Sequence, residues 1–330
     1  MTRADYFPTR PRRSGQSHRY MIQCPATGIW LPAALHADAK TAPSVIFEST
    51  GRATATVANA WILPVGPPAL GGSCASTTGP CQSCYAASLE AAYTSLAMMA
   101  ADNLASVRHV AAHGVDALAA WLAVMVDQSV AEQHALGIRR PTFRWHSGGD
   151  IGALVGTGIP RHTYPRAIRK ACRMTPNVEH WLYTRELWAL GSVTGPDNLS
   201  VYVSVDEDNL TDAAAAAARH SLPVALLAND EAHAATLWDQ IRSKWPNLAP
   251  HLACPATGKW RHDNRGPAHI VGPDGRRSSL TRGETAVGAC VACRACLPGG
   301  APRSVTFHMH NPGARLDAAV RRRIPVSVAP

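Results

Sequence analysis

Three cysteines in one short loop are the residues of this chain whose types and spacing most directly imply chemistry. Cys74, Cys81 and Cys84 fall within eleven positions of a stretch rich in glycine, serine, threonine and proline. Because such turn-rich loops lie at protein surfaces, they are poor places for ordinary core cysteines. A structural zinc site closes with four ligands, whereas a [4Fe–4S] cluster held by three cysteines leaves one iron open. We therefore predict a metal centre on this loop, with an iron–sulfur cluster favoured.

A second group of thiols lies near the end of the chain. Cys290, Cys293 and Cys296 form a CxxCxxC run followed by Leu-Pro, close to ferredoxin-type ligation, in which a distant cysteine completes the set. Cys254 is the natural distant ligand. Four cysteines also make a closed structural zinc site, so a second cluster and a zinc ion remain alternatives here. Cys172 lies among apolar residues of an expected helix and is predicted to be core.

A seven-residue motif occurs twice, at residues 24–30 and 254–260, with six of seven positions identical (Cys-Pro-Ala-Thr-Gly-x-Trp). The repeat indicates either two similar hairpin turns, for which glycine supplies the backbone freedom, or two related cysteine-bearing elements. Because no other cysteine lies near Cys24 in the sequence, we favour the hairpin-turn interpretation for that residue.

Bulk composition limits the class of protein. Of the 330 residues, 46% are hydrophobic and 17% charged, which permits a sizeable core and argues against general disorder. Nine cysteines in clustered groups favour metal binding in a reducing compartment over a disulfide scaffold. The first residues lack an apolar signal core, and the longest apolar run, 117–126, is about half a membrane span. We expect a cytoplasmic protein without a membrane partner.

The net charge of +9 is concentrated in arginines near both ends of the chain. A basic balance permits a nucleic-acid partner, although high arginine usage can equally reflect genome composition. The sequence shows none of the common nucleic-acid-binding signatures.

Apolar periodicity predicts alternating strands and helices through the middle of the chain. The expected strands are 60–65, 143–146, 178–184, 199–206, 223–228 and 248–253, and the expected helical segments are 85–134 with a break at Gly114, 162–174, 211–220 and 231–243. This rhythm predicts a parallel sheet or barrel, whose strand carboxyl ends carry the chemistry. We expect the Gly148-Gly149-Asp150 turn, Tyr183, Thr184, Ser204 and Asp206 to gather there.

The glycine turn that follows the second of these strands has two interpretations. Gly148 and Gly149 would let the backbone approach a ligand, and Asp150 would accept a hydrogen bond from an ammonium group. Alternatively the turn simply joins a strand to a helix, with Asp150 or Ser147 as the N-cap.

Taken together, three loop cysteines after a first strand, a Gly-Gly-acid turn after a second and a Ser-x-Asp strand end resemble radical S-adenosylmethionine (SAM) enzymes. That resemblance implies a partial (β/α)₆ TIM-like barrel in which Cys74, Cys81 and Cys84 bind a [4Fe–4S] cluster whose open iron chelates SAM. It also implies that Gly148, Gly149 and Asp150 lie where the family's Gly-Gly-Glu turn meets the SAM amino group. The spacing Cys-x₆-Cys-x₂-Cys departs from the family's common CxxxCxxC.

The motifs Cys-Tyr-Ala, Arg-Trp-His-Ser-Gly-Gly-Asp, Trp-Leu-Tyr-Thr-Arg and the late CxxCxxC resemble more closely a phage and plasmid family called gene product 88-like. The likeness covers roughly residues 60–311, includes His308 and His310, and implies no particular reaction.

We thus expect a basic arm and N-terminal extension (1–58), a βα-repeat barrel core (59–254), a Cys-rich metal-binding extension (255–311) and a basic tail (312–330). The function expected is that of a radical SAM-type enzyme acting on an unidentified substrate and supplied by an electron donor. The alternative is a non-enzymatic zinc or iron–sulfur protein with a basic nucleic-acid-binding surface. A fourth protein ligand at the first cysteine group, such as His146, would favour that alternative.

Overall fold

The computed structural model describes residues 18–37, 44–46, 53–135, 138–248, 251–254, 269–271, 277–279, 285–286, 294–298 and 303–308. No helix within these ranges is long and apolar enough to cross a membrane.

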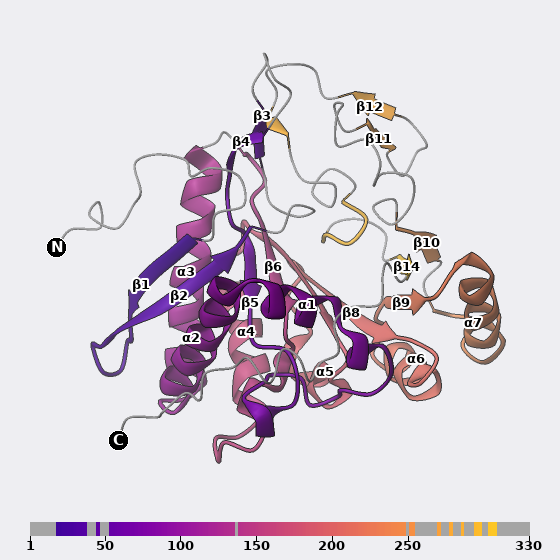
Figure 1. Ribbon diagram of the computed structural model, residues 1–330, viewed down its shortest axis with the longest axis horizontal. Helices are drawn as coiled ribbons and strands as arrows, with labels where there is room; N and C mark the ends of the chain where they lie inside the picture. The colour runs from indigo at the N-terminus through magenta and orange to yellow at the C-terminus, as the bar shows by residue number, and fades with distance from the viewer. Residues whose placement is uncertain are drawn as a thin grey trace.

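A nine-stranded sheet organises the molecule (Figure 1). Its strands, in spatial order, are β1 (His18–Gln23), β2 (Trp30–His36), β5 (Ala60–Ile62), β6 (Thr142–Gly148), β7 (Glu179–Thr184), β8 (Leu199–Val205), β9 (Val224–Ala228), β14 (Ser304–His308) and β10 (His251–Ala253). From β5 to β10 every neighbouring pair is parallel, whereas β1, β2 and β5 pair antiparallel. The sheet is mostly parallel and open, which confirms the predicted α/β class.

Helices fill the connections between the parallel strands. They are α1 (Tyr85–Ala92), α2 (Thr94–Ala111), α3 (Val115–Ala135), α4 (Thr163–Met174), α5 (Leu190–Val193), α6 (Leu210–Arg219) and α7 (Glu231–Lys244), with 3₁₀ turns η2 (Pro68–Leu70), η3 (Gly79–Ser83), η4 (Ile151–Leu154) and η5 (Leu187–Ala189). From β5 to β9 each strand lies beside the one before it in the chain. Right-handed crossovers that always step in one direction put their helices on the same face of a sheet. In Figure 1, α4, α5, α6 and α7 accordingly follow one another along the lower and right-hand side.

The two faces of the sheet are therefore different. On the helix face, Leu182 and Val203 share one large buried core with Ala167 of α4 and Trp238 of α7. On the second face, Tyr202, Ala225 and Val305 form a small cluster against which Tyr183, Cys254, Cys296 and Phe307 pack. Because successive side chains of a strand point to opposite faces, each strand contributes to both layers.

Most expected elements are present, with three differences. Within the N-terminal extension, β1, which was not among the expected strands, begins at His18 and joins the main sheet through β2. The expected helical segment 85–134 divides at Tyr93 as well as at Gly114, whose φ of +97° suits a residue without a side chain. The strand at 251–253 is not the last, because β14 inserts between it and β9.

Two small sheets lie outside the main one. The first contains β3 (Ser44–Ile46), β4 (Ala53–Thr56) and β13 (Thr285–Ala286), and the second pairs β11 (His269–Val271) with β12 (Arg277–Ser279). The first joins a segment of the N-terminal extension to one of the Cys-rich extension through the pairing of β13 with β3.

Candidate functional site

The cysteine loop leaves the carboxyl end of β5 and folds back on itself. Backbone hydrogen bonds connect Ser73 N to Pro64 O at 2.9 Å and Cys74 N to Gly66 O at 2.9 Å. The fold-back requires glycine at position 72, since a Cβ there would lie 1.8 Å from the Gly66 carbonyl oxygen. Cys74 therefore sits at a fixed point of the loop.

The glycine turn after β6 packs directly against this loop. Gly149 has a φ of +75°, and a Cβ at this position would lie 2.3 Å from Ser73 Oγ and 2.6 Å from Leu63 O. Ser73 Oγ donates to Pro64 O at 2.8 Å and accepts from Asp150 N at 3.0 Å. The protein's own loop thus explains the requirement for glycine at position 149, without a ligand.

Asp150 acts as a buried cap. Its Oδ1 accepts from Ile151 N at 2.7 Å and from Thr184 Oγ1 at 2.6 Å, and its Oδ2 accepts from Arg185 N at 2.9 Å. Burial, followed by the nearby Glu186 carboxylate, raises the pKa of Asp150 to about 7. These contacts support the capping interpretation, and binding of an ammonium group by Asp150 stays a prediction.

Glu186 holds the next part of the cysteine loop. This carboxylate is 2% exposed and lies two residues after the end of β7. Its Oε1 accepts from Ala75 N and Ser76 N, and its Oε2 accepts from Trp188 Nε1 at 2.7 Å. The backbone directly after Cys74 is therefore fixed by a charged group delivered from β7.

Arg185 places a buried positive charge beside the thiols. It forms an ion pair with Asp206 at the end of β8, and their side chains are 10% and 3% exposed. The Nε and Nη2 atoms of Arg185 are buried and have no hydrogen-bond partner among the described residues. Burial raises the pKa of Cys81 and the Arg185 guanidinium partly offsets that rise, so the guanidinium lies within electrostatic reach of this thiol.

The three thiols share one environment. Burial raises the pKa of all three: well above the ordinary value for Cys74, to about 11 for Cys81, and by a smaller amount for Cys84. Asp150 raises the pKa of Cys74 further, and the charges of Cys81 and Cys84 act on Cys74 and on each other. Their sulfur atoms do not all lie within 4.8 Å of one another. The loop carries three thiols, but their sulfur atoms are not close enough together to bind a single metal ion as they stand.

His146 does not join the three thiols. Residues 145–147 bulge out of the β5–β6 pairing, where Ala60 pairs with Arg144 and Ile62 with Gly148, and His146 has a φ of +58°. This backbone aims His146 at α4, where its Nε2 lies 2.9 Å from Tyr164 Oη. Tyr164 Oη accepts a hydrogen bond from the indole N–H of Trp61 and forms a second one with the His146 ring nitrogen. The expected alternative fourth ligand is thus engaged on the helix face.

The other predicted cofactor residues fall on different sides of the sheet. Thr184 contacts Asp150, whereas its neighbour Tyr183 packs on the second face, with its ring 5.3 Å from that of Tyr202. Ser204 shares the second face with Tyr202, since the two are two residues apart in β8. We expected these residues to gather at the carboxyl ends of the strands. The structure joins Thr184 to Asp150 and Asp206 to Arg185, and it packs Tyr183 against Tyr202 on the second face.

The second cysteine group is described in part. Cys254 follows β10, where its N–H donates to Thr306 O at 2.9 Å, and Cys296 packs against the same Tyr202 cluster. Tyr202 Oη donates to Ala295 O at 3.2 Å. Cys290 and Cys293 lie outside the described residues, so the ligand set stays a prediction. Cys172, by contrast, is buried on α4, as expected for a core residue.

Sequence reasoning did not single out Glu186, and it noted Arg185 only as the last residue of the motif Trp-Leu-Tyr-Thr-Arg. Both residues directly follow the carboxyl end of β7. This position after a buried strand was the one feature of the sequence that could have indicated a functional role. What the sequence could not indicate was that both side chains turn inward instead of reaching solvent.

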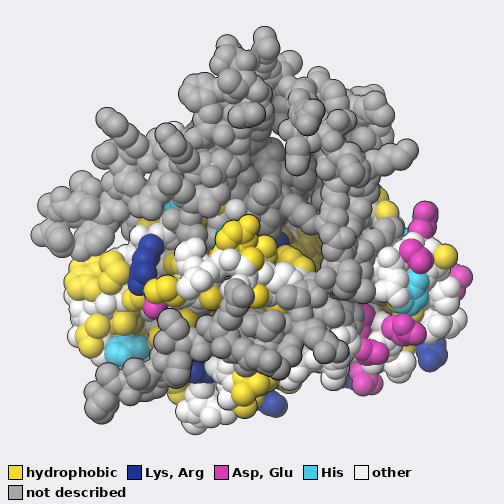
Figure 2. All heavy atoms as spheres, in the orientation of Figure 1, with side chains coloured by type: hydrophobic (Ala, Val, Ile, Leu, Met, Phe, Trp, Pro, Cys, Tyr) yellow, Lys and Arg dark blue, Asp and Glu magenta, His cyan; other side chains and the backbone are white. Residues whose placement is uncertain are grey.

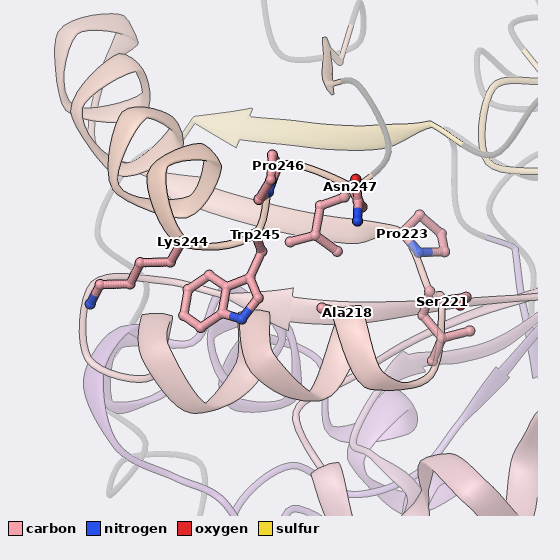
Figure 3. A pocket seen from close by; sticks show the side chains of 9 residues that line it. Ala218, Ser221, Pro223, Lys244, Trp245, Pro246 and Asn247 are labelled. Atoms are coloured by element: carbon pink, nitrogen blue, oxygen red, sulfur yellow. The ribbon is translucent and has the colours of Figure 1, made fainter.

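A separate cavity of about 550 Å³ lies far from this chemistry in the topology (Figure 3). Ser221 and Pro223 line it immediately before β9, together with Trp245 and Pro246 after α7. Residues that precede a parallel strand lie at the amino edge of the sheet, opposite the cysteine loop. Active sites of such sheets lie at the carboxyl edge, so this cavity is not our candidate.

Comparison with models of known protein families gave a match. A family model described as Gene product 88 matches residues 37–299, well over half of the chain. The comparisons with curated proteins and with solved structures gave no match. The matched span includes the cysteine loop, the glycine turn, the Arg185–Asp206 pair and all four cysteines of the second group. The chain therefore belongs to the Gene product 88 family.

Proposed function

We propose that this protein is a radical SAM-type enzyme whose Cys74, Cys81 and Cys84 hold a [4Fe–4S] cluster. The observation that carries the proposal is the arrangement at the carboxyl edge. One loop presents three half-buried thiols within electrostatic reach of Arg185, whose Nε and Nη2 atoms are buried and have no hydrogen-bond partner in the described part of the chain. Unpaired guanidinium nitrogens away from water cost free energy, and neighbouring thiols become metal ligands once they lose their protons.

The donor set fits a cluster better than a single zinc ion. Sulfurs around one tetrahedral zinc, at about 2.3 Å each, lie roughly 3.8 Å apart, whereas those of this loop are spread more widely. The positive charge of bound iron would offset the burial that now raises the pKa of each thiol. With His146 bonded to Tyr164, three cysteines would leave one iron open to an exogenous ligand.

The strand order supports the same proposal. Parallel strands that follow one another in chain order, with helices on one face, are what a partial (β/α)₆ barrel needs. The second face, with Tyr183 and Tyr202, would then be the inner wall. A substrate held there would approach the carboxyl edge from inside the curve of the sheet.

SAM would meet the chain's unpaired donors at this edge. The two unpaired Arg185 nitrogens match the planar geometry of a carboxylate, and the ion pair with Asp206 fixes the guanidinium. When bound and reduced, the cluster supplies the electron for reductive cleavage of SAM. The chain's own residues position the centre: Glu186 and Ser73 fix the loop, and Asp150 fixes the turn.

Anaerobic reconstitution tests the proposal. Protein prepared with iron and sulfide should contain about four irons for this loop, besides any at the second group, and with a strong reductant should release 5′-deoxyadenosine from SAM. Cys81→Ala should lose those irons and that product, whereas Cys172→Ala, which alters a buried core thiol, should keep both. Electron paramagnetic resonance of the reduced protein should change on addition of SAM, since the ligand reaches the open iron.

Two results would contradict the proposal. Zinc without labile sulfide in anaerobic wild-type protein would favour the non-enzymatic metalloprotein. Unchanged iron content in Cys81→Ala would show that the loop does not hold the cluster.

A further inference from the structure

A separate group of metal-ligating side chains lies at the other end of the molecule. Cys24 follows β1 in the turn of the β1–β2 hairpin, and His109 and His113 lie at the carboxyl end of α2. Their ligand atoms all lie within 4.8 Å of one another. In Figure 1 this turn is at the lower left, close to the end of α2, and Figure 2 shows a histidine side chain at the surface there.

The turn directs hydrogen-bond donors at the Cys24 sulfur. Its backbone is closed by two hydrogen bonds, from Cys24 N to Ile29 O at 2.7 Å and from Gly28 N to Cys24 O at 2.9 Å. Burial raises the pKa of Cys24, but hydrogen bonds from the Thr27 side chain and from the Ala26 and Thr27 backbones outweigh it, and the pKa is lowered. The thiolate is the form of cysteine that binds metal ions, and donors of this kind stabilise it.

The two histidines are presented on one side of the helix end. They are four residues apart, and α2 tightens beyond its last residue, where His113 N donates to Val110 O at 3.0 Å. Their rings stand edge to face with centroids 5.7 Å apart. The Nε2 atom of His109 is buried and has no hydrogen-bond partner in the described part of the chain. A buried imidazole nitrogen without a partner is costly unless something else binds it.

We propose that Cys24, His109 and His113 form a zinc site that joins the β1–β2 hairpin to the end of α2. One thiolate and two imidazoles are the borderline ligands that zinc prefers, and a three-ligand set leaves a fourth position for water. His113 is exposed, so that position faces solvent. Tetrahedral ligands lie roughly 3.5 Å apart, so only small side-chain movements are needed to close the present arrangement around one ion.

The sequence repeat supports this assignment independently. The motif that builds the Cys24 turn recurs at residues 254–260, where its cysteine belongs to the predicted second metal centre. The ligands missing in the sequence around Cys24 are supplied in space by a helix 85 residues further along the chain (Cys24 to His109). The structure confirms the hairpin turn expected at Cys24, and the turn leaves its cysteine next to imidazole nitrogens of another element.

Zinc counting on the full-length protein tests the proposal. His113→Ala should remove about one zinc ion per chain, whereas His113→Cys, which restores a zinc ligand, should retain it. His134→Ala is the matched control, because His134 is also an exposed histidine near a helix end but bonds to Ile138 O. Addition of a chelator should lower the Tm of the wild type and of His134→Ala by more than that of His113→Ala.

Substitution of the exposed His113 avoids the risk that Cys24→Ser, which alters a buried residue, fails to fold. Equal zinc content in the wild type, His109→Ala and His113→Ala would overturn the site. Loss of zinc in His113→Ala without rescue by His113→Cys would also overturn it, because the histidine would then act through the fold and not as a ligand.

Discussion

The cysteine loop after β5 and the Cys24 turn use the same side chain in opposite environments. In the loop, burial and neighbouring carboxylates raise the pKa of the thiols. In the turn, hydrogen bonds to sulfur lower the pKa of Cys24. The loop is therefore organised by charged groups around it, whereas the turn is organised by its own backbone. The cysteine loop should therefore lose its thiol protons only when a positively charged metal centre binds. The Cys24 turn should bind a single metal ion with little rearrangement.

The difference also concerns where the rigidity comes from. The loop depends on Glu186 and Asp150, which are delivered by other strands. The turn depends on hydrogen bonds within six residues of sequence, between positions 24 and 29. A change on β7 should disturb the loop and spare the turn, which makes the comparison testable.

The largest effect is expected for Glu186→Ala. It leaves the N–H groups of Ala75 and Ser76 and the indole of Trp188 without their acceptor, so the free energy of unfolding should fall by roughly 3–5 kcal/mol. Urea denaturation measures this loss, and zinc at Cys24 should persist in the folded protein. Glu207→Ala, which alters a largely exposed carboxylate, is the control. A stable Glu186→Ala protein with full iron content would break the comparison.

Gly149→Ala should have the next largest effect. Both Gly149 and Gly156 have φ near +75°, but a Cβ at position 149 meets Ser73 and Leu63, whereas one at position 156 has open space. We expect a loss of about 3 kcal/mol for Gly149→Ala and about 1 kcal/mol for Gly156→Ala. Thermal unfolding measures both losses. The loss in Gly156→Ala reports backbone strain alone, and the additional loss in Gly149→Ala reports displacement of the loop. Equal losses would show that the loop does not press on the turn.

The carboxyl group of Asp150 should make stability depend on pH. In the folded protein Asp150 keeps its proton to about pH 7, whereas in the unfolded chain it titrates near its ordinary value of 3.8. The folded state thus binds more protons between these values, and its contribution to stability falls as pH rises from about 4 to 7. Asp150→Asn should flatten this part of the profile in metal-free protein, and Asp239→Asn, at an exposed ion pair, should not. An unaltered slope in Asp150→Asn would assign the dependence to other groups.

The smallest effect is expected for Thr27→Val. Removal of the hydroxyl takes one hydrogen bond from the Cys24 sulfur, so zinc should bind roughly tenfold more weakly with little change in stability. Competition with a chromophoric chelator measures the affinity. Thr157→Val, whose hydroxyl bonds Leu154 O elsewhere, should leave it unchanged. Unaltered affinity in Thr27→Val would mean that the turn does not tune the thiolate.

The regular middle of the chain was readable from sequence because its signals are local. Strands 178–184 and 199–206 and the helix at 231–243 were expected within a residue or so of their observed bounds, since apolar periodicity and turn residues act over one element. The same alternation predicted a parallel sheet with the cysteine loop at its carboxyl edge. The placement of β14 between β9 and β10 was not predictable, because strand pairing across such a separation depends on the whole sheet.

The residues of the two candidate sites also fall into those that the sequence indicates and those that only the fold brings together. The sequence by itself determined which thiols are close along the chain, and it brought forward Cys74, Cys81, Cys84 and the Gly-Gly-Asp turn. Only the tertiary structure decided that Asp150 is a cap, that His146 turns to Tyr164, and that Arg185 comes within electrostatic reach of Cys81. Only it brought His109 and His113 to Cys24. The reason is physical: residue type and spacing fix local geometry, whereas a ligand set or a buried charge is completed by whichever element packs against it.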